Sequence, residues 1–301
     1  MRVSNYNNCR RLPAYGICRA RKIKKPAYSL IFFGVYLQKG TDTGNHLVSS
    51  RSSSDFVSHC NMAGFKTVFK RYEKKYKISA QQKELLLNAV ADKIRPDEYG
   101  ESTLCNIYFD TPSYRLIRAS IEKPIFKEKL RVRSYGTPDS QCTVFIELKK
   151  KYRGVVYKRR INMPYDCAMQ YLSGSNPPEG VNRQILSEVD YFLSYYSPII
   201  PTVALFYDRT AYYGIDDSQL RLTFDTNIRY RTDELDLKKG DYGSTLLSNE
   251  EYILEIKCIG SMPLWLTHEL DKLQIFPASF SKYGEVYKKI FNQNRRLMSV
   301  K

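Results

Sequence analysis

Several features that would assign a function directly are missing from this sequence. It has no Gly-rich phosphate-binding loop, which disfavours a P-loop enzyme. Its seven cysteines form no CxxC pair and show no metal-type spacing with the three histidines, so we interpret them as free thiols in a reducing, cytoplasmic compartment. No apolar run reaches the ~18 residues that a membrane-spanning helix needs.

One short apolar run lies near the N-terminus. Residues 29–37 follow a basic stretch at 19–25, an order that is typical of a signal peptide. The run starts late, however, and no small-residue cleavage site follows it. We therefore do not expect a signal peptide here.

Positive charge is what the chain has in excess. The formal net charge is +17, which indicates an anionic partner such as a nucleotide, a phosphate polymer, a nucleic acid or a membrane surface. Hydrophobic residues make up 43% of the chain, enough for a sizeable core. Tyrosine is frequent, with 25 residues against one tryptophan, and it suits half-buried strands with a solvated edge.

The first 61 residues differ from the rest. They carry ten Lys or Arg against two Asp or Glu, three of the seven cysteines and a serine-rich run at 49–54. Because they have no sustained apolar period, we expect residues 1–61 to form a disordered basic extension. A mis-assigned start upstream of Met62, and a basic tail that contacts an anionic surface, are the alternatives. Residues 62–301 form the expected folded domain.

Six stretches of the chain place charged residues at every second position. Side chains alternate between the two faces of a strand, so one face is apolar and the other is charged and mainly cationic. A face built repeatedly from Arg, Lys and a few Glu suggests a concave surface that holds a polyanion and a metal ion. The stretches are Arg71-Tyr72-Glu73-Lys74-Lys75, Lys129-Leu130-Arg131-Val132-Arg133, Phe145-Ile146-Glu147-Leu148-Lys149, Val156-Tyr157-Lys158-Arg159-Arg160, Arg221-Leu222-Thr223-Phe224-Asp225 and Leu254-Glu255-Ile256-Lys257.

The pattern predicts long strands with few helices. Ser79 is a plausible N-cap for a helix over 79–94. The remaining strands are expected at 104–110, 114–120 paired with 126–134, 141–150 paired with 155–163 across a turn at 152–154, 202–211, 220–230 and 252–258. Helices are expected within 165–196, interrupted at 173–180, and at 264–273 and 281–295. Charge on nearly every strand favours a barrel around an anion over a sandwich.

These motifs resemble a known family. Arg71-Tyr72-Glu73-Lys74-Lys75 is similar to the ExExK signature of the triphosphate tunnel metalloenzymes, the CYTH-like superfamily, with Arg71 in place of the first Glu. The motifs that follow, in the order of the VTC-domain branch of polyphosphate polymerases, are Lys129-Leu130-Arg131-Val132-Arg133, Glu147-Leu148-Lys149, Tyr207-Asp208-Arg209, Arg221 to Asp225, Leu254 to Lys257 and Ser281-Lys282-Tyr283. The resemblance runs from about residue 66 to 291.

The resemblance implies an α+β fold, a closed antiparallel β-barrel (a triphosphate tunnel) with flanking helices. It also implies metal-dependent transfer of the γ-phosphoryl group of ATP onto a polyphosphate chain. Phosphoryl transfer needs dense positive charge around the phosphate oxygens and little covalent chemistry from the protein, which agrees with the residue pattern. Loss of the first ExExK carboxylate favours a polymerase over a two-metal hydrolase.

The resemblance also assigns roles by motif position. The expected catalytic residues are Lys75, Arg131, Arg133, Lys149 and Lys282. The expected substrate-binding residues are Lys158, Arg209, Arg221, Lys257, Ser281 and Tyr283. Glu255 is the expected ligand for Mn²⁺ or Mg²⁺, with Glu73 as a second ligand or as the partner of Lys75; Glu147 fits either purpose.

Some charged residues have simpler interpretations. Arg159 and Arg160 fit ordinary solvated strand positions, and Lys257 fits an ion pair with Glu255. Asp225 fits a partner for a basic neighbour. Arg131 and Arg133 are harder to explain without a ligand, because two like charges on one strand face repel each other.

Three rival functions remain open. A tunnel triphosphatase would pass the same phosphoryl group to water, and a polyphosphate- or nucleotide-binding module would bind without turnover. A nucleic-acid binder would place aromatic rings on the charged face, whereas here aromatics mostly alternate with the charges. The expected partners are therefore ATP and inorganic polyphosphate, no nucleic acid, and a separate membrane protein if the product is exported.

Overall fold

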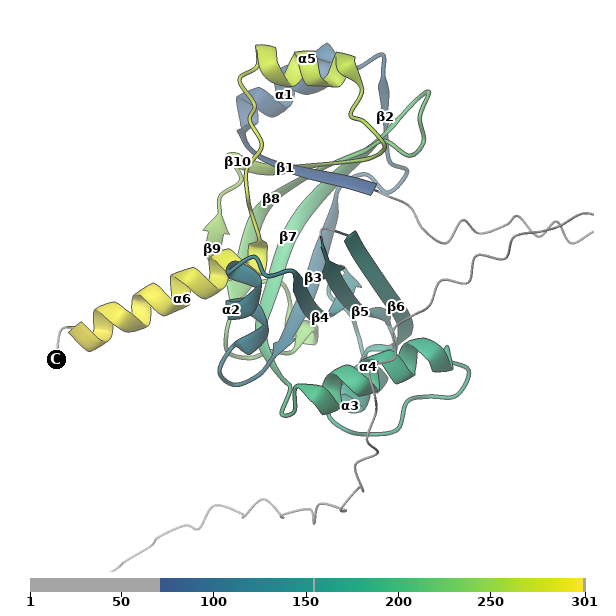
Figure 1. Ribbon diagram of the computed structural model, residues 1–301, viewed down its shortest axis with the longest axis vertical. Helices are drawn as coiled ribbons and strands as arrows, with labels where there is room; N and C mark the ends of the chain where they lie inside the picture. Colours follow the sequence, from purple (N-terminus) through teal and green to yellow (C-terminus); the bar gives the residue numbers. More distant parts are fainter. Residues whose placement is uncertain (1–70, 154, 300–301) are drawn as a thin grey trace, which may run out of the picture. The chain divides into compact units, whose positions relative to one another are not determined.

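The computed structural model describes residues 71–153 and 155–299, with side chains for residues 72–153 and 155–292. Within them the fold is α+β, built on one large antiparallel sheet (Figure 1). The strands are β1 (Arg71–Ser79), β2 (Ile94–Pro96), β3 (Ser102–Asp110), β4 (Phe126–Tyr135), β5 (Thr143–Tyr152), β6 (Val155–Pro164), β7 (Ile200–Gly214), β8 (Arg221–Arg231), β9 (Ser244–Leu247) and β10 (Glu251–Ile259). The helices are α1 (Ala80–Ala89), α2 (Arg115–Ile121), α3 (Tyr165–Leu172), α4 (Arg183–Tyr195), the 3₁₀ turn η1 (Leu237–Lys239), α5 (Leu264–Lys272) and α6 (Lys282–Ser299). The predictions for residues 1–61 lie outside the described residues.

The sheet follows the order β1-β10-β8-β7-β3-β4-β5-β6, with β2 added to β7 and β9 to β8. Among the described residues β1 and β6 are the ends of this order and do not pair, so the hydrogen bonding stops short of the expected barrel closure. The sheet is nevertheless strongly curved (Figure 1). Lys149 Nζ on β5 lies 3.8 Å from a carboxylate oxygen of Glu73 on β1, so the two ends of the sheet approach each other across one face.

Register places the predicted charges on that one face. Directly paired residues of antiparallel strands point to the same side. Lys75 pairs with Glu255, which pairs with Thr223, and Arg131 pairs with Glu147, which pairs with Arg160. We call this side of the sheet the concave face.

Apolar residues cover the opposite, convex face. Helices α3 and α4 pack there against β3 to β7, around Leu130, Ile146 and Phe192. Helices α1 and α5 pack against β1, β10 and β8, around Leu86 and Ile256. The hydrophobic effect thus fixes which face of each strand carries charge.

A third apolar cluster closes one end of the concave face. It joins Val203 and Leu205 of β7 to Ile117 of α2 and Val286 of α6. The first residues of α6 therefore lie beside the charged part of the same face.

Most predicted elements are confirmed, and one is wrong. The Ser79 side chain accepts a hydrogen bond from Gln82 N and caps α1 as expected, although the helix ends at Ala89. Residues 114–120 were predicted as a strand, but residues 115–121 form helix α2. The Asp110 carboxylate accepts hydrogen bonds from the backbone N–H groups of Leu116 and Ile117, at 2.8 and 3.0 Å, and so nucleates a helix directly after the Thr-Pro turn.

Across residues 71–153 and 155–299, none of the helices has both the length and the apolarity needed to cross a bilayer.

Candidate functional site

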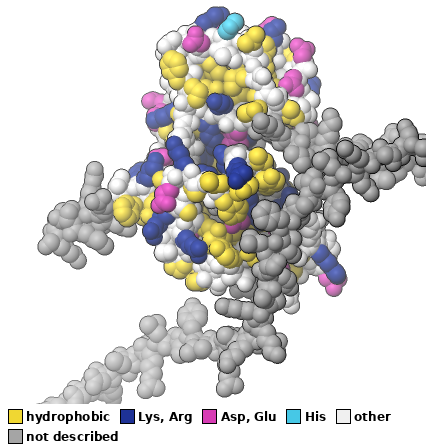
Figure 2. Space-filling model, in the orientation of Figure 1, with side chains coloured by type: hydrophobic (Ala, Val, Ile, Leu, Met, Phe, Trp, Pro, Cys, Tyr) yellow, Lys and Arg dark blue, Asp and Glu magenta, His cyan; other side chains and the backbone are white. Residues whose placement is uncertain are grey.

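Cationic side chains from seven strands converge on the concave face. Figure 2 shows Lys and Arg side chains, with a few acidic ones, gathered in the hollow between the upper and lower parts of the molecule. The predicted residues that the register brings to this face are Glu73, Lys75, Arg131, Arg133, Lys149, Lys158, Arg209, Arg221, Glu255 and Lys257.

Glu147 is the centre of the first group of ion pairs. Nε and Nη2 of Arg131 both donate to its Oε2, at 2.9 and 2.7 Å. Lys158 Nζ lies 2.7 Å from Oε1, and Arg160 donates to the same oxygen. Burial would raise the pKa of Glu147, but the charges of Arg131, Arg133 and Lys158 hold it well below its usual range. Glu147 therefore stays ionised and keeps these cations together.

Arg133 is 6% exposed, and its guanidinium is held by neutral acceptors. Its Nε donates to Asn106 Oδ1 and its Nη2 to the Tyr207 hydroxyl, both at 3.0 Å. Burial would raise the pKa of Tyr207, but Arg133 and Arg209 lower it to about 8. Neutral acceptors thus position the Arg133 guanidinium, whose charge also acts on the nearby Glu147 carboxylate.

Asp225, fully buried on β8, holds a second pair of cations. Arg209 grips it with Nε and Nη2, at 2.5 and 2.8 Å, and Lys282 of α6 donates to the same carboxylate. Burial would raise the pKa of Asp225, but Lys282 and Arg209 keep it low. The interpretation of Asp225 as the partner of basic neighbours is confirmed.

Glu255 and Glu73 form the carboxylate group of the site. Lys257 Nζ lies 2.9 Å from Glu255, and Lys75 Nζ lies 3.8 Å from Glu255 and 3.7 Å from Glu73. Lys75 thus lies close to both carboxylates. Burial would raise the pKa of Glu255, but Lys257 and Lys75 hold it well below its usual range.

This arrangement fits a divalent cation of the kind predicted. Mg²⁺ is commonly held by one or two carboxylates together with phosphate oxygens. Two adjacent carboxylates supply that much, while no cluster of three or more Asp, Glu, His or Cys side chains occurs among the described residues. A metal bound between Glu73 and Glu255 would complete its coordination with the substrate.

Lys129 was not singled out as a site residue, yet it lies on the concave face. Its Nζ donates to Ser281 Oγ at 3.0 Å, which gives the predicted residue Ser281 a place beside the cations. Burial and neighbouring lysines lower the pKa of Lys129 to about 8. Burial also lowers the pKa of Lys158 to about 8, against the opposing charge of Glu147.

Tyr283 is the predicted residue that the structure does not bring to the charged surface. It is 2% exposed; its hydroxyl donates to Asp110 at 3.0 Å and lies 3.0 Å from Thr202 Oγ1. Its ring stacks on Tyr108, with centroids 4.7 Å apart, and the Tyr108 hydroxyl accepts from Arg131 Nη1 at 3.1 Å. Tyr283 thus supports Arg131 from behind.

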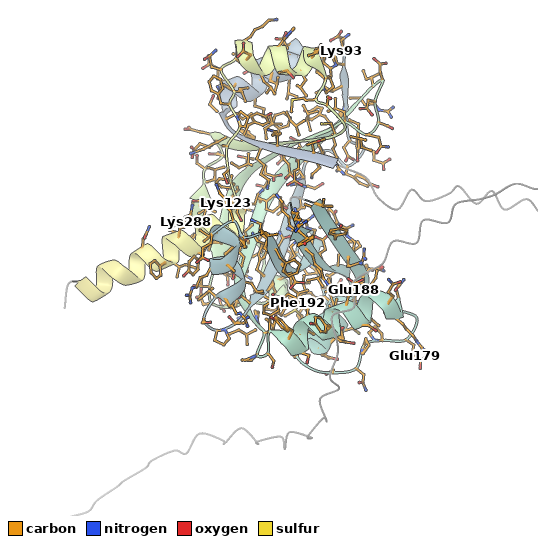
Figure 3. All side chains as sticks on the ribbon, in the orientation of Figure 1. Lys93, Lys123, Glu179, Glu188, Phe192 and Lys288 are labelled. Atoms are coloured by element: carbon orange, nitrogen blue, oxygen red, sulfur yellow. The ribbon has the colours of Figure 1, made fainter. Side chains whose placement is uncertain are left out.

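Arg159 and Arg160, both interpreted from the sequence as solvated strand residues, lie on opposite faces of β6. Arg159 faces away from the concave face and its Nε bonds Glu188 of α4 at 2.7 Å, a residue labelled in Figure 3. Arg160 instead joins the Glu147 group, with its guanidinium 4.6 Å from the Phe145 ring centroid. The alternation of the strand separates them, and that signal was present in the sequence.

The VTC domain family model matches residues 70–291, and no curated protein matches the sequence. A proposed adenylate cyclase from Bacillus halodurans is 17% identical, covers 69% of this chain and 92% of its own, and has a TM-score of 0.44. Another from Vibrio parahaemolyticus is 10% identical, with coverages of 73% and 98% and a TM-score of 0.37. A protein of Pyrococcus horikoshii OT3 is 11% identical, with coverages of 72% and 99% and a TM-score of 0.35. These scores are too low to carry an argument.

Proposed function

The chain belongs to the VTC domain family, and on that premise we propose that it is a polyphosphate polymerase-like phosphotransferase, which moves the γ-phosphoryl group of ATP onto a polyphosphate chain. The observation that carries the proposal is the concave face, where cations from seven strands and from the start of α6 surround four buried or half-buried carboxylates. Positive charge preorganised in this way stabilises phosphoryl transfer electrostatically.

In this proposal the curved sheet forms a closed tunnel, and the tunnel encloses the substrate. Contact between Lys149 and Glu73 supports it, because these residues belong to β5 and β1, near opposite ends of the sheet. A linear phosphate chain would lie along the enclosed face.

The cations of the concave face have different roles in this proposal. Arg131 and Arg133 grip the triphosphate, since a guanidinium matches phosphate geometry with two parallel donors. Lys282 lies near the transferred group. Further phosphate contacts come from Lys75, Lys149, Lys158, Arg209, Arg221 and Lys257.

Glu255 and Glu73 would hold Mn²⁺ or Mg²⁺. When bound, the ion neutralises charge that develops on the phosphate oxygens. Lys75 and Lys257, which pair with these carboxylates, would supply positive charge to the phosphates at the same place.

A product assay tests the proposal. The full chain is incubated with ATP and Mn²⁺ or Mg²⁺, and the products are sized on a gel. Polyphosphate longer than the substrate supports it. Phosphate and diphosphate alone would assign a triphosphatase, and tight binding without metal-dependent turnover would assign a binding module.

The reaction belongs in the cytoplasm, where ATP is supplied and thiols stay reduced. Residues 62–301 carry it out in this proposal, and a separate membrane protein is the proposed partner for export of the product.

A further inference from the structure

Large apolar side chains are exposed where β4 begins and β5 and β6 meet. Phe126 pairs with Tyr152, and Tyr152 pairs with Val155, so these three side chains form one row on the convex side. Each of them is at least 40% exposed. Ile125 lies beside the row, because its carbonyl oxygen accepts a hydrogen bond from Arg153 N at 2.9 Å, and its side chain is 68% exposed. Single exposed apolar residues are ordinary, whereas a contiguous group usually marks a contact surface.

Basic side chains surround this apolar group. Lys127 pairs with Lys151 on the concave side of the same strand ends, and Lys123 belongs to the loop before β4. Within the described part of the chain, none of Lys123, Lys151 and Arg153 forms an ion pair. Burial lowers the pKa of Lys127, and the charges of Lys151, Lys123 and Lys149 lower it further. The positive charges at this place therefore repel one another.

The nearest carboxylates do not neutralise them. Lys150 Nζ lies 3.8 Å from Glu128 and 3.5 Å from Glu188, on the convex side. Glu128 also accepts a hydrogen bond from the Tyr196 hydroxyl at 2.9 Å. Glu122 is the one acidic residue in the loop before β4. The surface therefore keeps an excess of positive charge, which only an outside partner can balance.

The combination of apolar and basic side chains indicates the chemistry of that partner. A phosphate polymer would pair with the lysines but would leave Ile125 and Phe126 in water. At a bilayer surface, aliphatic and aromatic side chains enter the boundary between headgroups and acyl chains, while Lys side chains extend to the headgroups. An anionic leaflet also supplies the missing counter-charge.

We propose that this end of the sheet, formed by Ile125, Phe126, Tyr152 and Val155 with the basic residues around them, docks on the surface of a bilayer that contains anionic phospholipids. We call it the docking end. The inference goes beyond the proposed function and does not depend on it, because none of these four residues has a role in the proposed phosphoryl transfer.

Vesicle sedimentation of the full chain tests the proposal. The vesicles consist of phosphatidylcholine, with or without phosphatidylserine. We expect binding to the vesicles with phosphatidylserine only, and weaker binding as salt screens the charges. Ile125→Ser/Lys123→Gln removes one apolar and one basic side chain from the docking end, and it should weaken vesicle binding roughly 25-fold.

Helix α5 offers a matched control. Leu264→Ser/Lys272→Gln makes the same chemical changes at two exposed positions, where Leu264 is 75% exposed and Lys272 pairs with Glu269. Because net charge changes equally in the two double variants, a difference between them reports position. The control should bind vesicles like wild type.

A second measurement locates the contact, since the basic residues 1–61 could attract anionic vesicles by charge alone. The one tryptophan of the chain, Trp265, belongs to α5. Tyr152→Trp adds a second fluorophore at the docking end. Vesicles with brominated acyl chains should quench part of the emission of the Tyr152→Trp protein and leave that of wild type unchanged.

Several results would overturn the docking end. They are no vesicle binding by wild type, wild-type binding by Ile125→Ser/Lys123→Gln, an equal loss in the α5 control, or no added quenching in Tyr152→Trp. If vesicles do not bind but soluble polyglutamate does, the partner is an acidic protein. If the docking-end variant instead weakens only tripolyphosphate binding, these residues extend the phosphate-binding surface. The product assay remains a separate test of the proposed function.

Discussion

Arg131 is a site residue whose replacement is simple to interpret. In Arg131→Ala, Glu147 keeps Lys158 and Arg160, so no buried carboxylate is left unpaired. We expect ATP affinity and turnover to fall together, by about 1.5–3 kcal/mol or roughly 10- to 150-fold. Arg159→Ala on the convex side is the control, and steady-state kinetics should leave it near wild type. Unchanged kinetics in Arg131→Ala would remove this residue from the site.

Lys158 makes the site sensitive to pH. Because its pKa is lowered to about 8, as is that of Lys129, both amines are charged at pH 7 and lose their charge as pH rises through 8. Tripolyphosphate affinity should therefore fall between pH 7 and pH 9. Lys158→Arg keeps its charge, so its affinity should fall less steeply across the same titration. If tripolyphosphate affinity falls equally steeply with pH in wild type and in Lys158→Arg, Lys158 does not contact the ligand.

Replacement of Glu255 distinguishes a metal-binding role of this residue from an ion-pairing role. As a metal ligand, its replacement in Glu255→Gln should abolish turnover while ATP still binds the basic surface. As a partner only for Lys257, its loss should lower the unfolding temperature and spare activity. A Mn²⁺ titration of turnover beside a thermal melt decides between them, and wild-type activity at ordinary metal concentration excludes the ligand role.

Among helices and strands, α2 and α6 depend on one carboxylate. Asp110 accepts hydrogen bonds from the backbone N–H groups of Leu116 and Ile117, which begin α2, and from the Tyr283 hydroxyl of α6. Asp110→Ala should lower the free energy of unfolding by about 2–4 kcal/mol, since it leaves several buried donors unpaired. Urea denaturation measures this loss. Asp139→Ala, which removes a comparable cap from an exposed loop, should cost less.

The same carboxylate shows where sequence patterns mislead. Residues 114–120 alternate well enough to resemble a strand, but the buried positions of α2 are Leu116, Ile117 and Ser120, which follow a helical period. The helix start depends on Asp110, which belongs to the preceding strand. By contrast, β4 and β5 were predictable, because one face of each had to match an apolar core while the other carried charge.

For the chain as a whole, the prediction concerns residues 1–61. Because their composition cannot support a core, a protein that starts at Met62 should fold and keep its activity. Circular dichroism and the product assay on both forms check this. An unfolded or inactive shorter protein would show that the segment contributes to the domain.

The residues of the site were only partly predictable from the sequence, because a local pattern does not show which residues the fold brings together. Period-2 charge identified Lys75, Arg131, Glu255 and their neighbours, since alternation is a local property. Asn106 and Tyr108, which hold Arg133 and Arg131, were not found, because they lie in a strand that is otherwise apolar. Asp97 belongs to a loop and reaches Arg221 only through the fold.

The carboxylates of the concave face have a consequence for selectivity. Glu73, Glu147, Asp225 and Glu255 are resident counter-ions, so a phosphate that enters the face exchanges with them and does not fill an empty trap. A single monovalent anion gains little from such an exchange, since it releases one carboxylate and replaces one contact. In the proposed function a linear polyanion would displace several at once, so we expect the protein to select anions by valence, with affinity increasing with each added phosphate.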